Sequence, residues 1–324
     1  MNTAEIVTKK NVSAADRRNV KKLSAMKSKD NIVFSLMSAP AVILVFIFSY
    51  IPMFGIILAF KNYNYHLGIL KSKWVGLKNF EFFFKSNDAM RVTWNTITLN
   101  FTFMFVGLAV SVIVALMLYE VHKRFLVKFY QTSMLLPHFL SMVIVAYIVY
   151  AFLNPNYGFI NTILRSLNIE EVSWYTQPKP WPLILLTVSV WKGFGMGSVV
   201  YYAALVGINK EFYEAAQIDG ATSFQQVRYI SIPFLLPIIT IYMILDVGKI
   251  FHSDFGLFYQ VTRDSGALYP TTDVIDTYVF RALRAWGDIG MSAAIGFFQS
   301  IVGFILVMVT NKIVKKIQPE NALF

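Results

Sequence analysis

Six long runs of apolar residues divide the chain, and polar or turn-forming segments separate them. Each run reaches the roughly 20 residues that an α-helix needs to cross the hydrocarbon core of a bilayer. Lipid offers no hydrogen bonds to the backbone, so we expect each run to be a membrane-spanning helix. The predicted fold class is therefore an all-α integral membrane protein with six transmembrane helices. The expected spans are residues 32–60, 92–119, 131–153, 181–208, 232–251 and 289–311.

Composition supports this class. Of the 324 residues, 56% are hydrophobic and 15% are charged, which is far from the usual share of a soluble domain. The chain contains no cysteine, so disulfides and thiolate metal sites are excluded and no redox compartment can be inferred.

The basic residues predict which side of the membrane each loop occupies. Four segments that an even number of spans places on one side carry 16 Lys and Arg in 78 residues, against 11 in 95 on the other side. This bias favours cytoplasmic N- and C-termini. The segments predicted to be cytoplasmic are a basic arm (1–31), residues 120–130, the loop 209–231 and a tail (312–324).

The net charge of +11 is partly explained by the arm. A secretory signal would have a short apolar core and a cleavage site, whereas residues 1–31 lead directly into an uncharged span. A basic arm can bind nucleic acid, but beside a first span it is more simply an anchor near anionic membrane lipid. We therefore expect membrane lipid and no nucleic acid among the partners.

The loop 209–231 has the local signals of a short helix. Asn209 is a good N-cap, and we expect Glu211 and Glu214 in the opening turn, where acidic groups suit the helix dipole. Ala215 and Ala216 follow as strong helix formers.

A break and a second helix come next. Gly220 can adopt the left-handed conformation that closes a helix, and Thr222 with Gln225 forms a predicted capping box for the next one. Pro233 and Pro237 mark the return to the membrane. The sequence thus predicts a structured loop that can contact a partner.

This loop resembles the cytoplasmic EAA loop of membrane subunits of binding-protein-dependent ABC importers. Order and spacing both match, and the one departure is Ile232, where that family usually has leucine, a conservative exchange. The matching residues are Glu214-Ala215-Ala216, Gly220-Ala221 and Ile230-x-Ile232-Pro233.

The resemblance implies a type I importer permease fold in a bacterial cytoplasmic (inner) membrane. It implies that the loop is a coupling helix that docks on a separate ATPase dimer, which carries the ATP and Mg. It further implies a second permease subunit, usually a different chain, and a periplasmic or extracellular solute-binding protein. The residues expected to couple to the ATPase are Glu214, Ala215, Ala216, Asp219, Gly220 and Ala221.

Charged and polar groups within the expected spans are candidates for a solute pathway, because a charge in hydrocarbon is costly unless it faces a cavity or a partner. Lys192 follows Trp191 in the fourth span, and a flat indole suits a sugar ring. Asp246 and Lys249 lie three residues apart on the fifth, close enough to pair. Each of these groups could instead join helices. Weaker pathway candidates are Asn95, Asn100 and Gln299.

Two expected outer segments carry further signals. Residues 74–80 are aromatic and basic, typical of a membrane interface, and they also resemble the Val-Gly-Leu-x-Asn-Phe/Tyr segment of sugar-type importer permeases. The long segment 252–288 carries both acidic and basic residues. It is either a cap at the pore mouth that meets a binding protein or a solvated connector.

Catalytic motifs are missing from the sequence. No Gly-x-x-x-x-Gly-Lys-Ser/Thr loop is present, so we expect ATP hydrolysis on a partner chain and no enzymatic activity here. Without cysteine, and with four histidines and no His-Glu-x-x-His motif, a metal site is not expected.

The function predicted by the resemblance is half of the translocation pathway of an ATP-driven importer. The overall likeness is to permeases for oligosaccharides or polysaccharide fragments, including those of bacterial alginate importers. The net charge suits an acidic glycan but does not decide the question. Two alternatives remain open at this stage: an ion-gradient-driven secondary transporter or channel, and a membrane scaffold or receptor that transports nothing.

Overall fold

The computed structural model describes residues 33–323, and the predicted arm 1–31 lies outside the described residues. The described part is mainly helical. It contains five helices long and apolar enough to cross a membrane, and a sixth span if one sharply bent helix pair is counted as one. The predicted all-α membrane fold is confirmed.

The chain divides into two compact units, Met1–Ile57 and Leu58–Phe324. The described part of the first unit is most of the helix Val33–Phe60, which has no charged residue. A helix that is apolar on all sides is typical of a membrane span.

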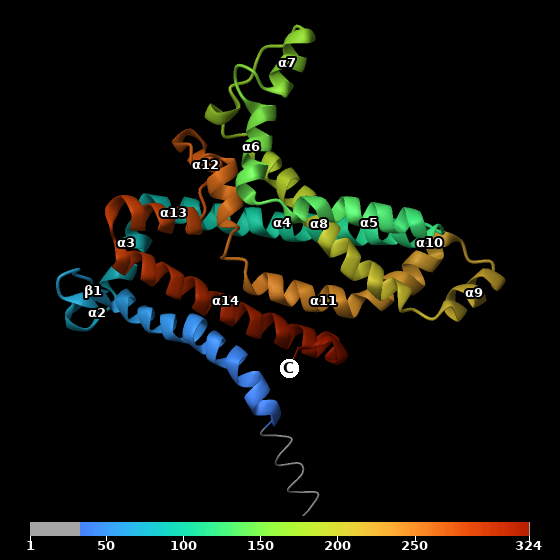
Figure 1. Cartoon of the computed structure of the whole chain (residues 1–324), viewed down its shortest axis with the longest axis horizontal. Coiled ribbons are helices and arrows are strands. Elements are labelled where there is room, and N and C mark those ends of the chain that lie inside the picture. Colours follow the sequence, from blue (N-terminus) through green and yellow to red (C-terminus); the bar gives the residue numbers. More distant parts are fainter. Residues whose placement is uncertain (1–32, 324) are drawn as a thin grey trace, which may run out of the picture. The chain divides into compact units, whose positions relative to one another are not determined.

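The second unit is built on long helices that run side by side (Figure 1). Helix α8 packs along both α4 and α5, and α11 packs along α14. Their bounds are Asn87–Tyr119 for α4, Arg124–Phe139 for α5, Trp181–Val206 for α8, Ile232–Gly248 for α11 and Ile289–Ile317 for α14.

Glycines allow these helices to approach closely. A Cβ on Gly195 of α8 would lie 1.9 Å from the carbonyl oxygen of Met134 in α5. A Cβ on Gly303 of α14 would lie 2.5 Å from the carbonyl oxygen of Gly248 in α11. Small residues at such crossings are how helices pack in membranes, where no hydrophobic force drives them together.

The third predicted span is broken. A single helix over residues 131–153 was expected, but α5 ends at Phe139 and α6 (Met142–Leu153) continues at an angle of 96°. Pro137 lies in the last turn of α5, Leu140 is extended, and the Ser141 side chain accepts a hydrogen bond from the backbone N–H of Ile144. The prediction of one continuous helix was therefore wrong.

The segment 252–288 is a packed layer, so its interpretation as a solvated connector was wrong. Leu257, Phe258, Val261 and Leu268 are buried in one core cluster with residues of α4, α6 and α8. The elements of this layer are η5 (Gly256–Val261), η6 (Gly266–Leu268), α12 (Tyr269–Thr272), α13 (Ile275–Arg281) and η7 (Ala282–Trp286).

Shorter elements complete the unit. Strands β1 (Lys61–Asn62) and β2 (Lys73–Trp74) pair antiparallel, with Lys61 opposite Trp74. The remaining elements are α2 (Gly68–Lys71), α3 (Lys78–Lys85), α7 (Phe159–Ser166), η3 (Trp174–Thr176), α9 (Lys210–Ile218), α10 (Ser223–Gln226), η4 (Val227–Ser231) and η8 (Pro319–Asn321).

Several boundaries differ from the sequence prediction. Helix α4 begins at Asn87 rather than at residue 92, and α5 begins at Arg124 within a segment expected to be a loop. Helix α14 continues through all three lysines of the predicted tail to Ile317. Lys and Arg extend an amphipathic helix end into the interface because their stems are apolar, so charge marks the edge of the hydrocarbon rather than the end of the helix.

Candidate coupling and transport sites

The predicted coupling loop begins with a capped helix. The Asn209 side chain accepts a hydrogen bond of 3.1 Å from the backbone N–H of Glu211 and so starts α9, which confirms the predicted N-cap. Glu211 lies in the first turn. Glu214, which was expected in that turn, lies beyond it, so this part of the prediction was wrong.

The break after α9 has the predicted geometry. Gly220 adopts a left-handed conformation with φ 78°, and the backbone N–H of Ala221 donates to the carbonyl oxygen of Ala216 at 2.8 Å. Thr222 and Gln225 form the predicted capping box of α10. The loop is therefore folded by its own sequence, through caps that each satisfy otherwise unpaired backbone groups.

Most predicted coupling residues are exposed on the surface of the chain. Glu214, Ala215, Asp219 and Gly220 are exposed, whereas Ala216 and Ala221 are half-buried. Large apolar side chains that were not among the predicted coupling residues are also exposed, above all Ile218 at 87% and Phe224 at 72%. An exposed apolar pair on a polar loop is typical of a contact surface.

Tyr213 attaches this loop to the membrane helices. Its hydroxyl lies 3.0 Å from the Ser231 hydroxyl just before α11, and its ring lies 5.7 Å from that of Tyr119 at the end of α4. Figure 1 shows α9 and α10 at one end of the bundle and α13 at the other. Tyr213 and Ala216, three residues apart, are the half-buried positions of α9, so this spacing of apolar residues is the sequence signal that could have identified the attached face.

Lys192 holds the break in the third span. Its ammonium group donates to the carbonyl oxygens of Leu140 at 2.8 Å, His138 at 2.9 Å and Pro137 at 3.4 Å. These carbonyls end α5, where a helix lacks partners for its last acceptors and carries partial negative charge. The lysine thus joins α8 to α5, and its role in a solute pathway stays a prediction.

The other predicted pathway residues are not brought together. Trp191 is 39% exposed on α8, and Lys249 ends α11 with its backbone N–H bonded to the Asp246 carbonyl oxygen at 3.0 Å. Among the described residues no ion pair joins the side chains of Asp246 and Lys249. Of the four, only Asp246 lines an apolar cavity that lies between helices of the bundle.

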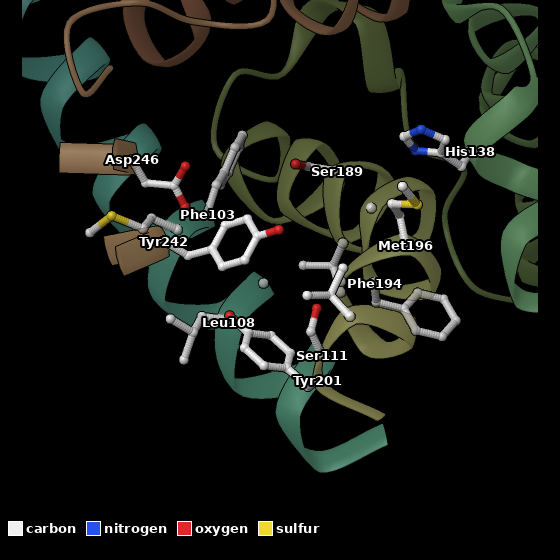
Figure 2. A pocket seen from close by; sticks show the side chains of 16 residues that line it. Phe103, Leu108, Ser111, His138, Ser189, Phe194, Met196, Tyr201, Tyr242 and Asp246 are labelled. Carbon is white, nitrogen blue, oxygen red and sulfur yellow. The ribbon is translucent and has the colours of Figure 1, made fainter. Parts of the chain in front are cut away.

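This bundle cavity has a volume of about 380 Å³ and lies between α4, α5, α8 and α11. Figure 2 shows the Asp246 carboxylate on one side and His138 on the other, with Phe103 and Tyr242 between them near Asp246. Its other labelled residues include the hydroxyl-bearing Ser111, Ser189 and Tyr201. An apolar wall with a few polar groups is the usual form of a ligand pocket.

Helical spacing could have identified part of this cavity. Ser189, Gly193, Met196, Gly197 and Val200 line it from α8 at intervals of three and four residues, which places them on one face. Hydroxyl groups carry no charge and can bond their own helix, so they give a weaker sequence signal than a lysine or an aspartate.

The amide side chains predicted as weaker pathway members bond the backbone of the outer layer, and their role in a solute pathway stays a prediction. Asn95 donates to the carbonyl oxygen of Asp273 at 3.1 Å, and Asn100 donates to that of Ile250 at 2.8 Å. Gln299 is buried and donates to the carbonyl oxygen of Phe251 at 2.5 Å. These groups satisfy irregular backbone, which at membrane depth requires partners inside the protein.

Asn79 of the aromatic outer segment has a similar role. Its side-chain amide donates to the carbonyl oxygens of Ala59 at 2.9 Å and Lys61 at 3.0 Å. A Cβ on Gly290 of α14 would lie 2.7 Å from the same amide nitrogen. Asn79 thus packs this aromatic segment against the start of α14.

A buried ion cluster stabilises the outer layer. The Asp273 carboxylate, 1% exposed, is paired with Arg281 and, at 3.4 Å, with Arg91. Arg281 also pairs with Asp264 at 3.0 Å and lies over the Tyr269 ring at 4.1 Å. Burial is the largest single effect on the pKa of Arg281 and lowers it, but the charge and hydrogen bond of Asp273, together with Tyr269 and Asp264, raise that pKa above its ordinary value.

Within the described part of the chain, no group of three or more His, Cys, Asp or Glu is placed to hold a metal ion. The apolar spans, the exposed capped loop at one end and the cavity between helices together define the membrane subunit of a transport system. The chain belongs to the family of binding-protein-dependent transport system inner membrane components, whose profile matches residues 107–319.

Relatives agree with this assignment over most of the chain. LplB of Bacillus subtilis is 34% identical over 286 residues, which cover 88% of this chain and 89% of LplB. The polygalacturonan/rhamnogalacturonan transport system permease protein YteP of the same organism is 33% identical, and the alignment covers 88% of both chains.

A solved structure matches the fold. A chain from a bacterial ABC transporter involved in the import of the acidic polysaccharide alginate is similar with a TM-score of 0.82 and 32% identity, covering 92% of this chain and 99% of that one. The predicted kinship with sugar importer permeases is confirmed, and the protein is a multi-pass membrane transport component.

Proposed function

We propose that this chain forms half of the translocation pathway of an ATP-driven importer for acidic oligosaccharides. The observation that carries the proposal is the folded loop 209–231, whose predicted coupling residues are mostly exposed. It combines the family's coupling motif with exposed apolar side chains at one end of the bundle. A separate ATPase dimer binds this loop on the cytoplasmic side. The ATPase subunits, and not this chain, bind ATP and Mg.

The coupling step follows from how the loop is attached. Tyr213 contacts Ser231 before α11 and Tyr119 at the end of α4. A displacement of α9 by the ATPase is therefore passed to two helices that line the bundle cavity. Movement of packed helices as rigid bodies is a common basis of alternating access.

The class of solute is inferred from the relatives. One of them is a permease for polygalacturonan and rhamnogalacturonan, and the matched structure belongs to an importer of alginate. Both names describe acidic polysaccharides. A second structure of the alginate transporter, with a TM-score of 0.81 and 32% identity, contains a periplasmic protein bound to an alginate pentasaccharide. A solute-binding protein and a second, different permease are the partners proposed here.

Within the pathway, the bundle cavity is the proposed contribution of this chain, with Asp246 and the surrounding hydroxyl groups facing the solute. Membership in the permease family argues against the two alternatives left by the sequence, an ion-gradient-driven transporter and a scaffold.

The test is purification of the tagged chain in mild detergent, followed by mass spectrometry and an ATPase assay with tetragalacturonate, an alginate tetramer and a neutral tetrasaccharide. We expect a co-purifying ATPase and second permease, with hydrolysis raised by an acidic oligomer together with the binding protein. Isolation of the chain without a nucleotide-hydrolysing companion would contradict the coupling role.

A further inference from the structure

A second cavity, here called the outer cavity, lies where α6 of the broken third span meets the segment 252–288 that was expected outside the membrane. Its volume is about 250 Å³, and it lies between α6 and the end of η5. This is below the roughly 300–1,000 Å³ of pockets that enclose whole drug-sized ligands, so it suits one ring of a longer chain. The lining residues are Val143, Ala146, Tyr147, Tyr150, Tyr259, Gln260, Arg263 and Asp264.

Arg263 supplies a positive charge to this cavity. Its guanidinium lies over the Tyr150 ring, 4.1 Å from the ring centroid. A guanidinium stacked in this way keeps its in-plane N–H groups free to bind a carboxylate in a two-point contact. Within residues 33–323, no carboxylate oxygen lies within 4.0 Å of this side chain.

The one acidic lining residue is ion-paired. Asp264 pairs with Arg281 at 3.0 Å and accepts a hydrogen bond from the Tyr269 hydroxyl at 3.1 Å. Arg284 lies nearby, with its Nη1 atom 3.3 Å from the Tyr259 hydroxyl oxygen, and it too has no carboxylate within 4.0 Å in the described part of the chain. The charged groups at the cavity without an ionic partner in the described part of the chain are therefore the guanidinium groups of Arg263 and Arg284.

The cavity walls suit a sugar. Tyr147 and Tyr150 lie three residues apart on α6 and share a face, and Tyr147 is 70% exposed. An exposed aromatic face can pack against the C–H face of a pyranose while its hydroxyl meets solvent. The Gln260 amide adds both a donor and an acceptor for sugar hydroxyls.

We propose that the outer cavity binds one uronic acid residue of the solute, with Arg263 binding its carboxylate and Tyr147 packing against its ring. This inference rests on the proposed function, because it assumes an acidic glycan as solute. It adds a site at the outer end of the pathway, away from the bundle cavity. The site selects for charge before the solute reaches the helices.

The test measures binding to the purified complex of this chain with its second permease and ATPases, without the solute-binding protein. The probes are tetragalacturonate and its fully methyl-esterified form, which has the same rings but no carboxylate charge. Saturation-transfer NMR gives the dissociation constant of each. We expect the acid to bind about tenfold more tightly than the ester, the difference made by a charge-assisted two-point contact.

Arg263→Gln removes that preference and leaves the acid and ester within about twofold of each other, whereas Arg263→Lys keeps part of it because charge remains without the planar fork. Tyr147→Ala weakens the binding of both probes. The matched control is Arg165→Gln, which removes an exposed arginine of another outer segment that pairs with Glu171. This control leaves the dissociation constants of both probes unchanged.

Absence of acid binding, equal binding of both probes to the unchanged complex, or an acid preference that survives Arg263→Gln would overturn this site. An equal loss of both probes in Arg263→Gln would also overturn it, and would assign Arg263 to a contact with another subunit. If the complex still shows ATP hydrolysis stimulated by acidic oligomers, only the site has failed. If no ATPase co-purifies, the proposed function has failed first.

Discussion

The ammonium nitrogen of Lys192 lies 2.8 Å from the carbonyl oxygen of Leu140, the residue at which the third span breaks. Two further carbonyl oxygens of the same helix end, those of Pro137 and His138, accept from the same group. A charge in a membrane span usually indicates a pathway, and whether or not Lys192 also faces solute, its charge caps the end of a neighbouring helix. It fixes where α5 ends and α6 turns away.

Lys192→Met should therefore destabilise the bend. The substitution keeps most of the apolar stem and leaves three carbonyl oxygens without their donor, and the loss of such charged hydrogen bonds costs about 1.5–3 kcal/mol. The measurement is the thermal unfolding midpoint in detergent, together with protease cleavage near Ser141. Lys179→Met, at an exposed position, is the control. Equal midpoints for the two variants would show that the cap does not hold the break.

Asp273→Asn should destabilise the outer layer more strongly. It removes the charge that two arginines share in a buried setting, and breaking a buried pair on one side typically costs about 3–5 kcal/mol. Unfolding in detergent measures the effect, with Glu171→Gln as the control because that carboxylate pairs with Arg165 at the exposed surface. A loss no larger than the control's would mean that water reaches the cluster.

Sequence reasoning succeeded where local chemistry decides the structure. The caps at Asn209 and Thr222 and the left-handed Gly220 depend on a few adjacent residues, and all three were predicted. The apolar spans were also predicted, since their length and composition reflect the bilayer rather than any particular contact.

The errors arose where distant residues decide. The bend at Leu140 depends on a lysine from α8, more than fifty residues away along the chain. Asn100 and Gln299 were predicted as pathway residues because they are polar within spans, and their hydrogen bonds to backbone carbonyls of the segment after α11 were not predicted. Periodicity shows which residues are polar but not which partner they meet, so the bundle cavity was predicted only through Asp246.

Gly220→Val should uncouple transport from ATP hydrolysis with little effect on membrane insertion. The position has φ 78° and no atom within 4 Å of an added Cβ, so the cost comes from the backbone, about 1–2 kcal/mol for an L residue in this region and more for a β-branched one. Gly220→Asn is the matched control, because asparagine adopts this conformation readily. Solute-stimulated ATPase activity should fall in the first variant and persist in the second. If solute-stimulated ATPase activity persists in both variants, coupling does not require a residue in the left-handed conformation at the break.

Glu214→Lys should weaken binding of the ATPase without lowering the stability of this chain. The side chain is exposed on α9 and has no hydrogen bond or ion pair among the described residues, so its reversal disturbs nothing within the subunit. If the ATPase surface is complementary to the carboxylate of Glu214, a lysine there meets a charge of its own sign. Such a contact slows association and can cost several kcal/mol of binding free energy. Glu214→Gln tests whether charge or shape matters, and we expect an intermediate effect. Pull-down of the ATPase and transport rate are the measurements, and unchanged values for both variants would show that the coupling contact is made by the exposed apolar side chains Ile218 and Phe224 instead.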